Sequence, residues 1–295
     1  MNALFNNITP CNDEVLFVIG NGFDLAHGIE SSYWDFAQWV KAQGNNQLIG
    51  LMDIFFSNNR SLWSDVETAL GEYDEEDILD YCRPEEGIDY DHMLRSVAAV
   101  EDAPDFLFKP TLEEFLSEYR EWVDSIDISR ATVNQELLPD YRYLTFNYTE
   151  MLEQIYGIPS TQVFHIHGSR LQHDDYILGH NNFKDEHLYD TLNGELYFEQ
   201  DTKNKIISWM NVLYKNTQGI IHRNQLFFDS LCNIKLVVVK GHSLYDVDWP
   251  YFDEIAKHVS KDAQWLFFYH SEADLDRIEK YTNHLGITNY RLSQS

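Results

Sequence analysis

Residues 15–28 read VLFVIGNGFDLAHG, an apolar run that passes directly into two glycines around one asparagine. The run Val15–Ile19 is rich in β-branched side chains and ends at a turn signal, so it predicts a buried strand. A helix should follow Gly20–Gly22, because glycines allow a tight turn and the next helix offers its free N–H groups to a phosphate. The stretch predicts either a pyrophosphate-binding turn or a tight turn without a ligand. Leu25 stands where the third glycine of the dinucleotide fingerprint belongs.

Short apolar runs of the same kind recur along the chain, and helical patterns separate most of them. We predict further strands at Tyr143–Phe146, Gln162–Ile166, Tyr176–Leu178, Lys235–Val239, Gln264–Tyr269 and Asn289–Leu292. We predict helices at Thr149–Tyr156, Trp249–Val259 and Glu272–His284. Strands that alternate with helices form a parallel sheet covered on both faces. The sequence therefore predicts an α/β fold.

One long interval interrupts this alternation, because no convincing strand pattern lies between Gly22 and Tyr143. Its clearest helix is Thr111–Ile126, where Thr111 and Glu114 form a capping box in front of an apolar stripe. The interval therefore predicts a large helical module inserted into the α/β fold.

The predicted boundaries place the helical module at residues 31–139 and the α/β domain at residues 1–30 and 140–295. A second insertion, Glu186–Asn224, combines a strand-like segment, Glu195–Phe198, with a helix.

The chain of 295 residues is strongly acidic, with 49 Asp and Glu against 21 Lys and Arg and a formal net charge of −28. Such a surface repels phosphate backbones and anionic lipids, so we expect no binding to nucleic acid or to membranes. Asp65–Asp91 is especially acidic, and a run of this kind is typical of a solvated face or a mobile loop.

We predict neither a signal peptide nor a transmembrane segment. The stretch MNALFNNITP lacks a basic region followed by an apolar core, and the longest apolar runs hold four or five residues. A bilayer takes roughly 20 apolar residues, so we expect a cytoplasmic protein. The three cysteines form no C-x-x-C pair, so we expect neither a disulfide framework nor a cysteine-rich zinc site.

Polar residues follow several predicted strands at the point where each strand ends. They are Asn147, His167 and the segment Gly241–Ser243. Carboxyl ends of parallel strands meet at one edge of the sheet, where α/β proteins bind their ligands. We therefore expect these residues to form one site with Gly20–Gly22. The alternative is that Asn147 only caps the following helix and that His167 only packs.

The segment VFHIHG, residues 163–168, contains two histidines at alternating positions. Side chains alternate along a strand, so His165 and His167 should lie on the same face. His167 is nearer the carboxyl end, where an imidazole that titrates near neutrality suits a general base or a ribose contact. His165 lies deeper in the strand and should serve stability. Asp246 and Asp248 follow the last of these strand ends, and either carboxylate suits a ribose hydroxyl.

Five segments together resemble the AbiH family of bacteriophage abortive infection proteins, namely GNGFDLAHG, LTFNYTEMLEQIYG, HIHG, ILGHNN and GHSLYDVDWPYF. The resemblance extends from about residue 15 to residue 269 and implies a role in phage defence.

The same segments are similar, at a distance, to the motifs of sirtuins. The sirtuin G-A-G loop resembles Gly20–Gly22, and the T-Q-N strand end resembles Thr145–Asn147. The H-G pair resembles His167 with its following glycine, and the G-T-S segment resembles Gly241–Ser243. This similarity implies a Rossmann-like NAD site. The zinc module of sirtuins has no counterpart here, and sirtuin-like bacterial defence proteins that lack it hydrolyse NAD.

The residues and the resemblance together predict hydrolysis of NAD at the nicotinamide–ribose bond, with NAD as the substrate and no metal. Asn147 would hold the ribose and the attacking water, and His167 would contact a ribose hydroxyl or act as general base. The residues expected to bind the nucleotide are Gly20, Asn21, Gly22, Asp24, Thr145, Gly241, His242, Ser243 and Asp248. Among them, Gly20–Gly22 would hold the pyrophosphate, and Ser243 a phosphate or the adenosine ribose. Asp24 would bond the nicotinamide ribose or favour the amino end of its helix.

Two other functions fit parts of the pattern. A non-catalytic domain would bind NAD or ADP-ribose as a sensor, or would bind a protein partner. The histidines His165, His167, His180 and His242 suggest a metallophosphoesterase, but that chemistry begins with a D-x-H strand end, and the first strand here ends in Gly-Asn-Gly. The family resemblance further implies control by self-association or by a phage-derived trigger.

Overall fold

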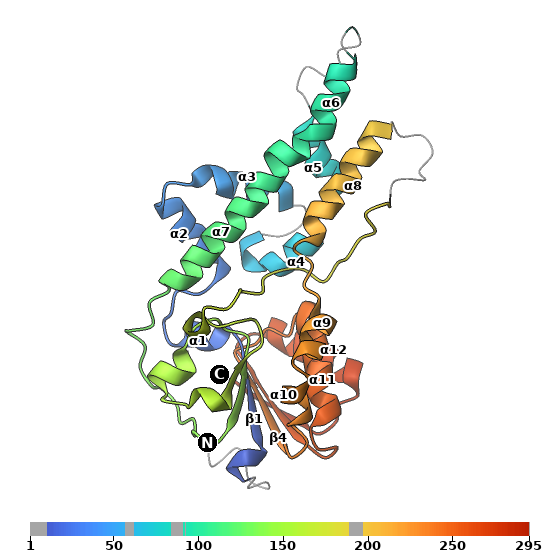
Figure 1. Ribbon diagram of the computed structural model, residues 1–295. Coiled ribbons are helices and arrows are strands. Elements are labelled where there is room, and N and C mark those ends of the chain that lie inside the picture. The colour runs from blue at the N-terminus through green and yellow to red at the C-terminus, as the bar shows by residue number, and fades with distance from the viewer. Residues whose placement is uncertain (1–10, 57–61, 84–90, 92, 189–196, 295) are drawn as a thin grey trace. The chain divides into compact units, whose positions relative to one another are not determined.

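A computed structural model describes residues 11–56, 62–83, 91, 93–188 and 197–294 (Figure 1). The chain divides into two compact units, each assembled from separate stretches of sequence. The sheet unit is formed by Met1–Ser32, Val123–Ile177 and Asn216–Ser295. The helical unit is formed by Tyr33–Trp122 and Leu178–Lys215. The helical unit thus includes a second stretch that the sequence-based boundaries assigned to the α/β domain.

The sheet unit is built on six strands. They are β1 (Val15–Ile19), β2 (Arg142–Thr145), β3 (Val163–His165), β4 (Leu236–Lys240), β5 (Gln264–Tyr269) and β6 (Tyr290–Gln294). All neighbouring strands pair in parallel, in the order β3-β2-β1-β4-β5-β6. This is the strand order of the Rossmann fold. Strands β2 and β3 are added on one side of β1 and strands β4 to β6 on the other, so the strand order reverses between β1 and β4. The prediction of a Rossmann-like α/β fold is confirmed.

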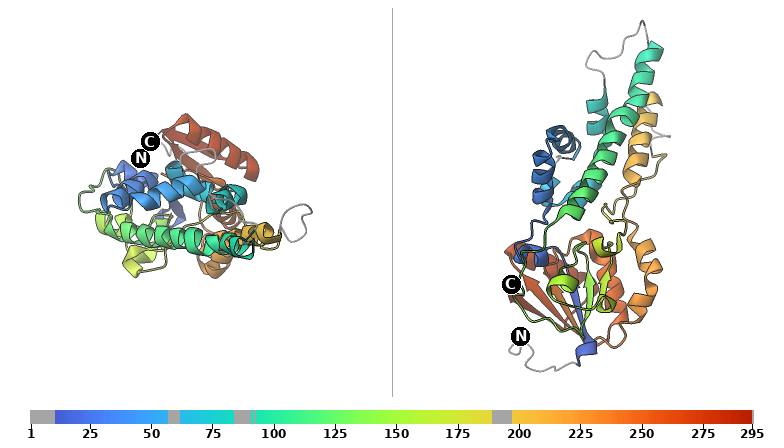
Figure 2. Two further views of the ribbon diagram at one scale, coloured as in Figure 1. Left: turned by 90° about the horizontal axis from the view of Figure 1, so that it is seen from above. Right: turned by 60° about the vertical axis from the view of Figure 1, so that its left-hand side comes forward.

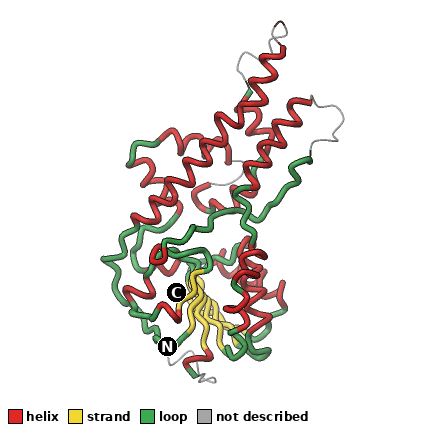
Figure 3. The backbone as a smooth tube through the Cα atoms, viewed as in Figure 1, coloured by secondary structure: helices red, strands yellow, loops and turns green. Residues whose placement is uncertain are grey.

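Helices cover both faces of this sheet, because each central strand is apolar on both sides (Figure 3). The helices of the sheet unit are α1 (Gly22–Ala26), α9 (Thr217–Arg223), α10 (Gln225–Asp229), α11 (Trp249–His258) and α12 (Glu272–Leu285). On one face, α9 to α12 pack against the core that includes Val18 and Val239. On the other face, α1 and the π-helix Met151–Ile155 pack against Phe17 and Val238.

The helical unit contains α2 (Tyr33–Ala42), α3 (Asn46–Phe56), α4 (Val66–Gly71), α5 (Glu75–Cys82), α6 (Met93–Ala103), most of α7 (Lys109–Ser125) and α8 (Tyr197–Asn211). The π-helix Pro104–Phe108 joins α6 to α7, and Figure 2 shows them as one continuous rod. The chain is therefore already helical before Thr111, whose hydroxyl donates to the carbonyl oxygen of Leu107. The predicted capping box at Thr111 is wrong for this reason.

Two predicted strands in the second half of the chain have a different outcome. Tyr176–Leu178 is irregular, and the N–H of Ile177 donates to the carbonyl oxygen of His167 over 2.9 Å instead of joining the sheet. Of the strand-like Glu195–Phe198, the first two residues lie outside the described residues, and α8 begins at Tyr197.

The acidic stretch Asp65–Asp91 binds lysines from Leu178–Lys215, the second stretch of the helical unit. Glu67 pairs with Lys215 at 2.5 Å, and Glu75 pairs with Lys184 at 2.7 Å. Glu75 and Lys215 are buried. The prediction of a solvated face or mobile loop is therefore wrong for this part of the stretch, because ion pairs between distant segments hold it. Residues 84–90 of the stretch lie outside the described residues.

Within the described ranges, no helix combines the length and the apolar character needed to cross a bilayer.

Candidate functional site

The loops that follow β1 and β4 pack directly against each other at the carboxyl edge of the sheet. The N–H of Gly22 donates to the carbonyl oxygen of Gly241 over 2.7 Å. A Cβ atom on Gly20 would lie 2.6 Å from the Cα of His242, and one on Gly241 would lie 2.2 Å from the backbone nitrogen of Phe23. Gly241 also adopts a φ of +69°, which favours glycine. The glycines are therefore required for the close contact between the two loops.

This packing occupies groups that the sequence suggested for a pyrophosphate. Besides the bonded N–H of Gly22, the N–H of Phe23 donates to the carbonyl oxygen of Gly20 over 2.9 Å. The Asn21 amide is bonded to both the carbonyl oxygen and the hydroxyl of Ser31, each over 2.7 Å. A phosphate bound at this turn needs donors other than these.

Asp24, on α1, lies at the centre of a buried hydrogen-bond network. Its Oδ1 accepts from Asn147 Nδ2 over 2.8 Å, and its Oδ2 accepts from the Thr149 hydroxyl over 2.5 Å. The side chain is completely buried, and this burial raises the pKa of Asp24 to about 6. The hydrogen bonds from Thr149 and Asn147, and the nearby His27 and Arg170, act in the opposite direction. Asp24 therefore orients Asn147.

The nitrogen and the oxygen of the Asn147 side-chain amide differ in their hydrogen bonding. Its Nδ2 donates to Asp24 and also lies 3.3 Å from the carbonyl oxygen of Gly20. Its backbone N–H donates to Thr145 Oγ1 over 3.1 Å. Its Oδ1 is buried and makes no hydrogen bond. A buried acceptor of this kind is costly unless a donor, such as a water or a ligand hydroxyl, reaches it.

A second buried cluster places one carboxylate between two imidazoles. Asp248 Oδ2 lies 3.3 Å from His242 Nε2, and Asp248 Oδ1 lies 3.7 Å from His167 Nε2. The N–H of Leu244 donates to His242 Nδ1 over 3.0 Å, so the proton of neutral His242 is on Nε2 and faces Asp248. The Phe146 ring packs edge-on against both imidazoles.

The two histidines of β3 and its end have different surroundings. His165 Nδ1 lies 2.9 Å from the carbonyl oxygen of Asn147, and its Nε2 lies 2.9 Å from Glu153. His167 instead packs edge-on against Tyr251. The prediction that they share a face is wrong, because β3 ends at His165 and the alternation of a strand does not extend to His167.

The structure brings the predicted strand-end residues to one edge of four adjacent strands, β3, β2, β1 and β4. Gly20 touches both Asn147 and His242, and Phe146 touches both His167 and His242. Ser243 is exposed, and its carbonyl oxygen accepts from Arg277 Nε over 2.6 Å.

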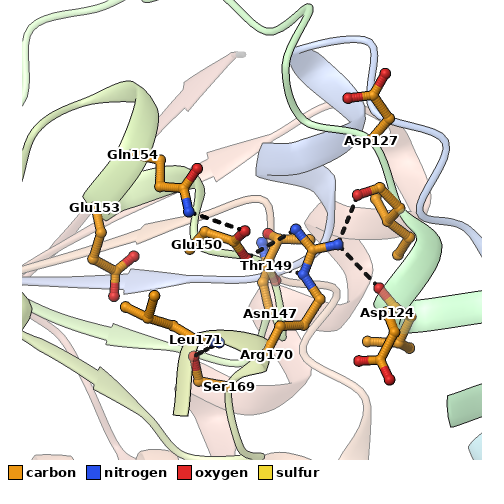
Figure 4. Close-up of polar contacts among 12 residues, drawn as sticks. Asp124, Asp127, Asn147, Thr149, Glu150, Glu153, Gln154, Ser169, Arg170 and Leu171 are labelled. Atoms are coloured by element: carbon orange, nitrogen blue, oxygen red, sulfur yellow. Dashed lines mark hydrogen bonds and ion pairs between the residues drawn. The ribbon is translucent and has the colours of Figure 1, made fainter. Parts of the chain in front are cut away.

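A cavity of about 770 Å³ lies beside the Asp24 network, also within the sheet unit. Its lining residues are Asp124, Ile126, Asp127, Ile128, Ser129, Glu150, Gln154, Ile155, Arg170, Leu171 and His173. Arg170 donates to Glu150 over 2.9 Å and to the carbonyl oxygens of Val123 and Ile126 over 3.1 and 2.6 Å. Figure 4 shows its guanidinium between Glu150 and the backbone near Asp124.

Sequence reasoning missed two of these polar residues, Thr149 and Arg170. Thr149 stands two positions after Asn147, and Arg170 stands two positions after the His-Gly pair. Each position lies within five residues of a strand end, and a search for all polar residues in these loops would have found them.

His180, one of the histidines that suggested a metal enzyme, belongs to the helical unit. Its Nε2 bonds the carbonyl oxygen of Met210 over 3.0 Å, and burial lowers its pKa. Among the residues that the structure describes, no group of three or more His, Cys, Asp and Glu side chains is arranged to hold a metal ion.

We expect Asp24→Asn to remove a loss of stability that the wild type undergoes as pH rises. In the unfolded chain the Asp24 carboxyl group loses its proton near pH 3.8, whereas in the folded protein its pKa is about 6. The native state is therefore most favoured below pH 3.8, and this contribution is lost as pH rises through 6. Relative to the variant, the wild type should lose up to about 3 kcal/mol of unfolding free energy between pH 4 and pH 7. Urea titrations at each pH measure this difference.

Asp127→Asn is the control for this experiment. Asp127 is exposed, and a hydrogen bond from Ser129 lowers its pKa, so its contribution has the opposite sign. Parallel pH profiles for the two variants would contradict the assignment to Asp24.

A family model matches the part of the chain that contains the strand-end motifs. The family model "Bacteriophage abortive infection AbiH" matches residues 16–269, which is most of the chain. No curated protein matches the chain significantly. Because this match covers most of the chain, the chain belongs to the bacteriophage abortive infection family AbiH, and its role lies in abortive infection, a response to phage.

Proposed function

We propose that the protein acts in phage defence by hydrolysing NAD at the bond between nicotinamide and ribose. The observation that carries this proposal is the buried, unbonded Oδ1 of Asn147, which stands, like His167, after a strand end at the carboxyl edge of a Rossmann-like sheet. In sheets of this order, nucleotides bind outside the carboxyl ends of the strands, where the strand order reverses.

The reaction needs few protein groups. Cleavage passes through an oxocarbenium-like transition state, and the leaving nicotinamide is already a cationic pyridinium, so little acid assistance is required. Asn147 Oδ1 accepts a hydrogen bond from the attacking water or from a ribose hydroxyl. His167 accepts a proton from that water or bonds the ribose. No metal takes part in this mechanism.

The neighbouring residues position these two groups. Asp24 and Gly20 accept from the Asn147 amide nitrogen, so the amide oxygen is presented to the ligand. Asp248 faces His167 Nε2 and is itself held by His242. In this arrangement Asp24, His242 and Asp248 support the site, whereas the sequence suggested direct contact with the nucleotide.

A nucleotide sensor is the second candidate, because the central side chains are little exposed. Asn147 is 8% exposed and His167 is 5% exposed. A ligand that reaches them must displace the groups that bury them, and binding of NAD or ADP-ribose would then change the local conformation without turnover. A phage-derived trigger or self-association is the form of control that this burial favours.

The test is release of nicotinamide from NAD by the purified protein, followed by chromatography, with and without extract from phage-infected cells. NAD in infected cells that express the protein is measured in parallel. Nicotinamide release by the wild type supports the hydrolase. If the triggered protein binds NAD and leaves it intact, the sensor function replaces hydrolysis.

A further inference from the structure

Lys240 is the last residue of β4 and stands directly before Gly241, beside the reversal in strand order. Its ammonium donates to Gln135 Oε1 and lies 4.6 Å from the centroid of the Phe268 ring. All three residues belong to the sheet unit. Burial lowers the pKa of Lys240, and no neighbouring charge contributes to the shift. Among the described residues, no carboxylate forms an ion pair with this lysine.

This environment differs from that of the fully buried lysines Lys203 and Lys215. Lys203 pairs with Glu76 at 2.5 Å, and Lys215 pairs with Glu67 at 2.5 Å. In a chain with 49 acidic residues and only 21 Lys and Arg, carboxylates are abundant. A half-buried ammonium without one loses hydration and gains little in return. The position is therefore suited to an anion that arrives from solution.

Gln135 contributes a second donor at the same place. Its Oε1 accepts from Lys240, which fixes the orientation of the amide, because the opposite orientation would set two donors against each other. Its Nε2 is buried without a hydrogen bond of ordinary geometry, although the amide lies near the Tyr156 hydroxyl and, as a weak donor to it, opposes the burial that raises the pKa of Tyr156. The Tyr156 hydroxyl beside it is bonded to His27 Nε2 and to Asn134 Oδ1. Two adjacent donors thus lack an anionic acceptor.

We propose that Lys240 and Gln135 bind a phosphate group of a nucleoside diphosphate ligand, in place of the glycine turn after β1. An ammonium binds phosphate as a point charge, and an amide N–H adds one directed hydrogen bond. The N–H groups of Gly22 and Phe23 are bonded within the two packed loops, so they do not compete for this role. The identity of the ligand rests on the proposed NAD site, whereas binding of the phosphate itself does not require hydrolysis.

The experiment is calorimetric titration of the full-length protein with ADP-ribose and with inorganic pyrophosphate at fixed ionic strength. Lys240→Met should weaken binding of both by roughly 10- to 100-fold, because a charge-assisted hydrogen bond is lost. Lys240→Arg should retain most of the affinity. Lys261→Met, which removes an exposed lysine before β5 at the amino edge of the sheet, should leave binding unchanged.

Thermal unfolding of each variant checks the fold, and Met is expected to be tolerated because it replaces a buried charge with an apolar chain of similar length. Weaker binding by Lys240→Met alone supports the inference even if the wild type never releases nicotinamide. Equal affinities of the wild type and Lys240→Met for ADP-ribose overturn it, and NAD hydrolysis can still hold in that case. Failure of the wild type to bind either probe also overturns it.

Discussion

Gly241→Ala should lower the free energy of unfolding by about 3–5 kcal/mol, the largest stability effect that we expect from a single methyl group here. Gly241 has a φ of +69°, and an added Cβ would lie 2.2 Å from the backbone nitrogen of Phe23 and 2.7 Å from the carbonyl carbon of Gly22. Both neighbours are backbone atoms at the start of α1, so they cannot rotate away. The substitution must therefore separate the two loops. Urea unfolding followed by tryptophan fluorescence measures the loss.

Gly28→Ala is the matched control, because Gly28 has a similar φ of +74° but no atom lies within 4 Å of the added Cβ. It should cost only about 1 kcal/mol, the penalty of a left-handed conformation for alanine. The difference between the two variants isolates the contact between the loops. Equal losses would show that the loops do not depend on this close approach.

Asn147→Ala should slow the proposed NAD hydrolysis by roughly 30- to 1000-fold, or about 2–4 kcal/mol of transition-state stabilisation. The variant lacks the buried Oδ1 that would accept from the water or the ribose. Because Asp24 also loses a donor, we expect an accompanying loss of about 1–2 kcal/mol in stability. Initial rates of nicotinamide release, measured well below the unfolding temperature of the variant, separate the two effects.

Asn289→Ala is the control for this variant. The side-chain amide nitrogen of Asn289 also donates two hydrogen bonds, to the carbonyl oxygens of Asp262 and Ala263. Asn289 differs from Asn147 in its position, because it stands just before β6 at the amino edge of the sheet. It should lose stability without losing activity. A comparable drop in nicotinamide release for Asn289→Ala would mean that destabilisation, and not the missing acceptor, explains the effect at Asn147.

The strands could be predicted from the sequence because their signal is local. Val15–Ile19 and Gln264–Tyr269 are observed at the predicted residues, since a short apolar run between turn signals has few other ways to bury its side chains. The helix Glu272–Leu285 is likewise set by its own residues, because Ser271 and Asp274 form a capping box at its start. Parallel pairing followed from the alternation of strands with helices.

Other features depended on contacts between segments far apart in the chain. Tyr176–Leu178 has the composition of a strand, yet it is irregular. The acidic stretch after Asp65 resembles a solvated loop until Lys184 and Lys215 supply its counter-charges. Charge composition alone does not show which cations lie nearby, so neither outcome could be predicted locally.

The sequence by itself determined the α/β class, the strand ends that carry polar residues and the family. Only the tertiary structure decided what those residues do to one another. The glycines after β1 and β4 allow the close contact between the two segments. Asp24 orients the Asn147 amide through a hydrogen bond between residues that are 123 positions apart in the sequence. The physical reason is that burial and hydrogen-bond partners are set by which backbone segments meet, and strand order is a property of the whole chain.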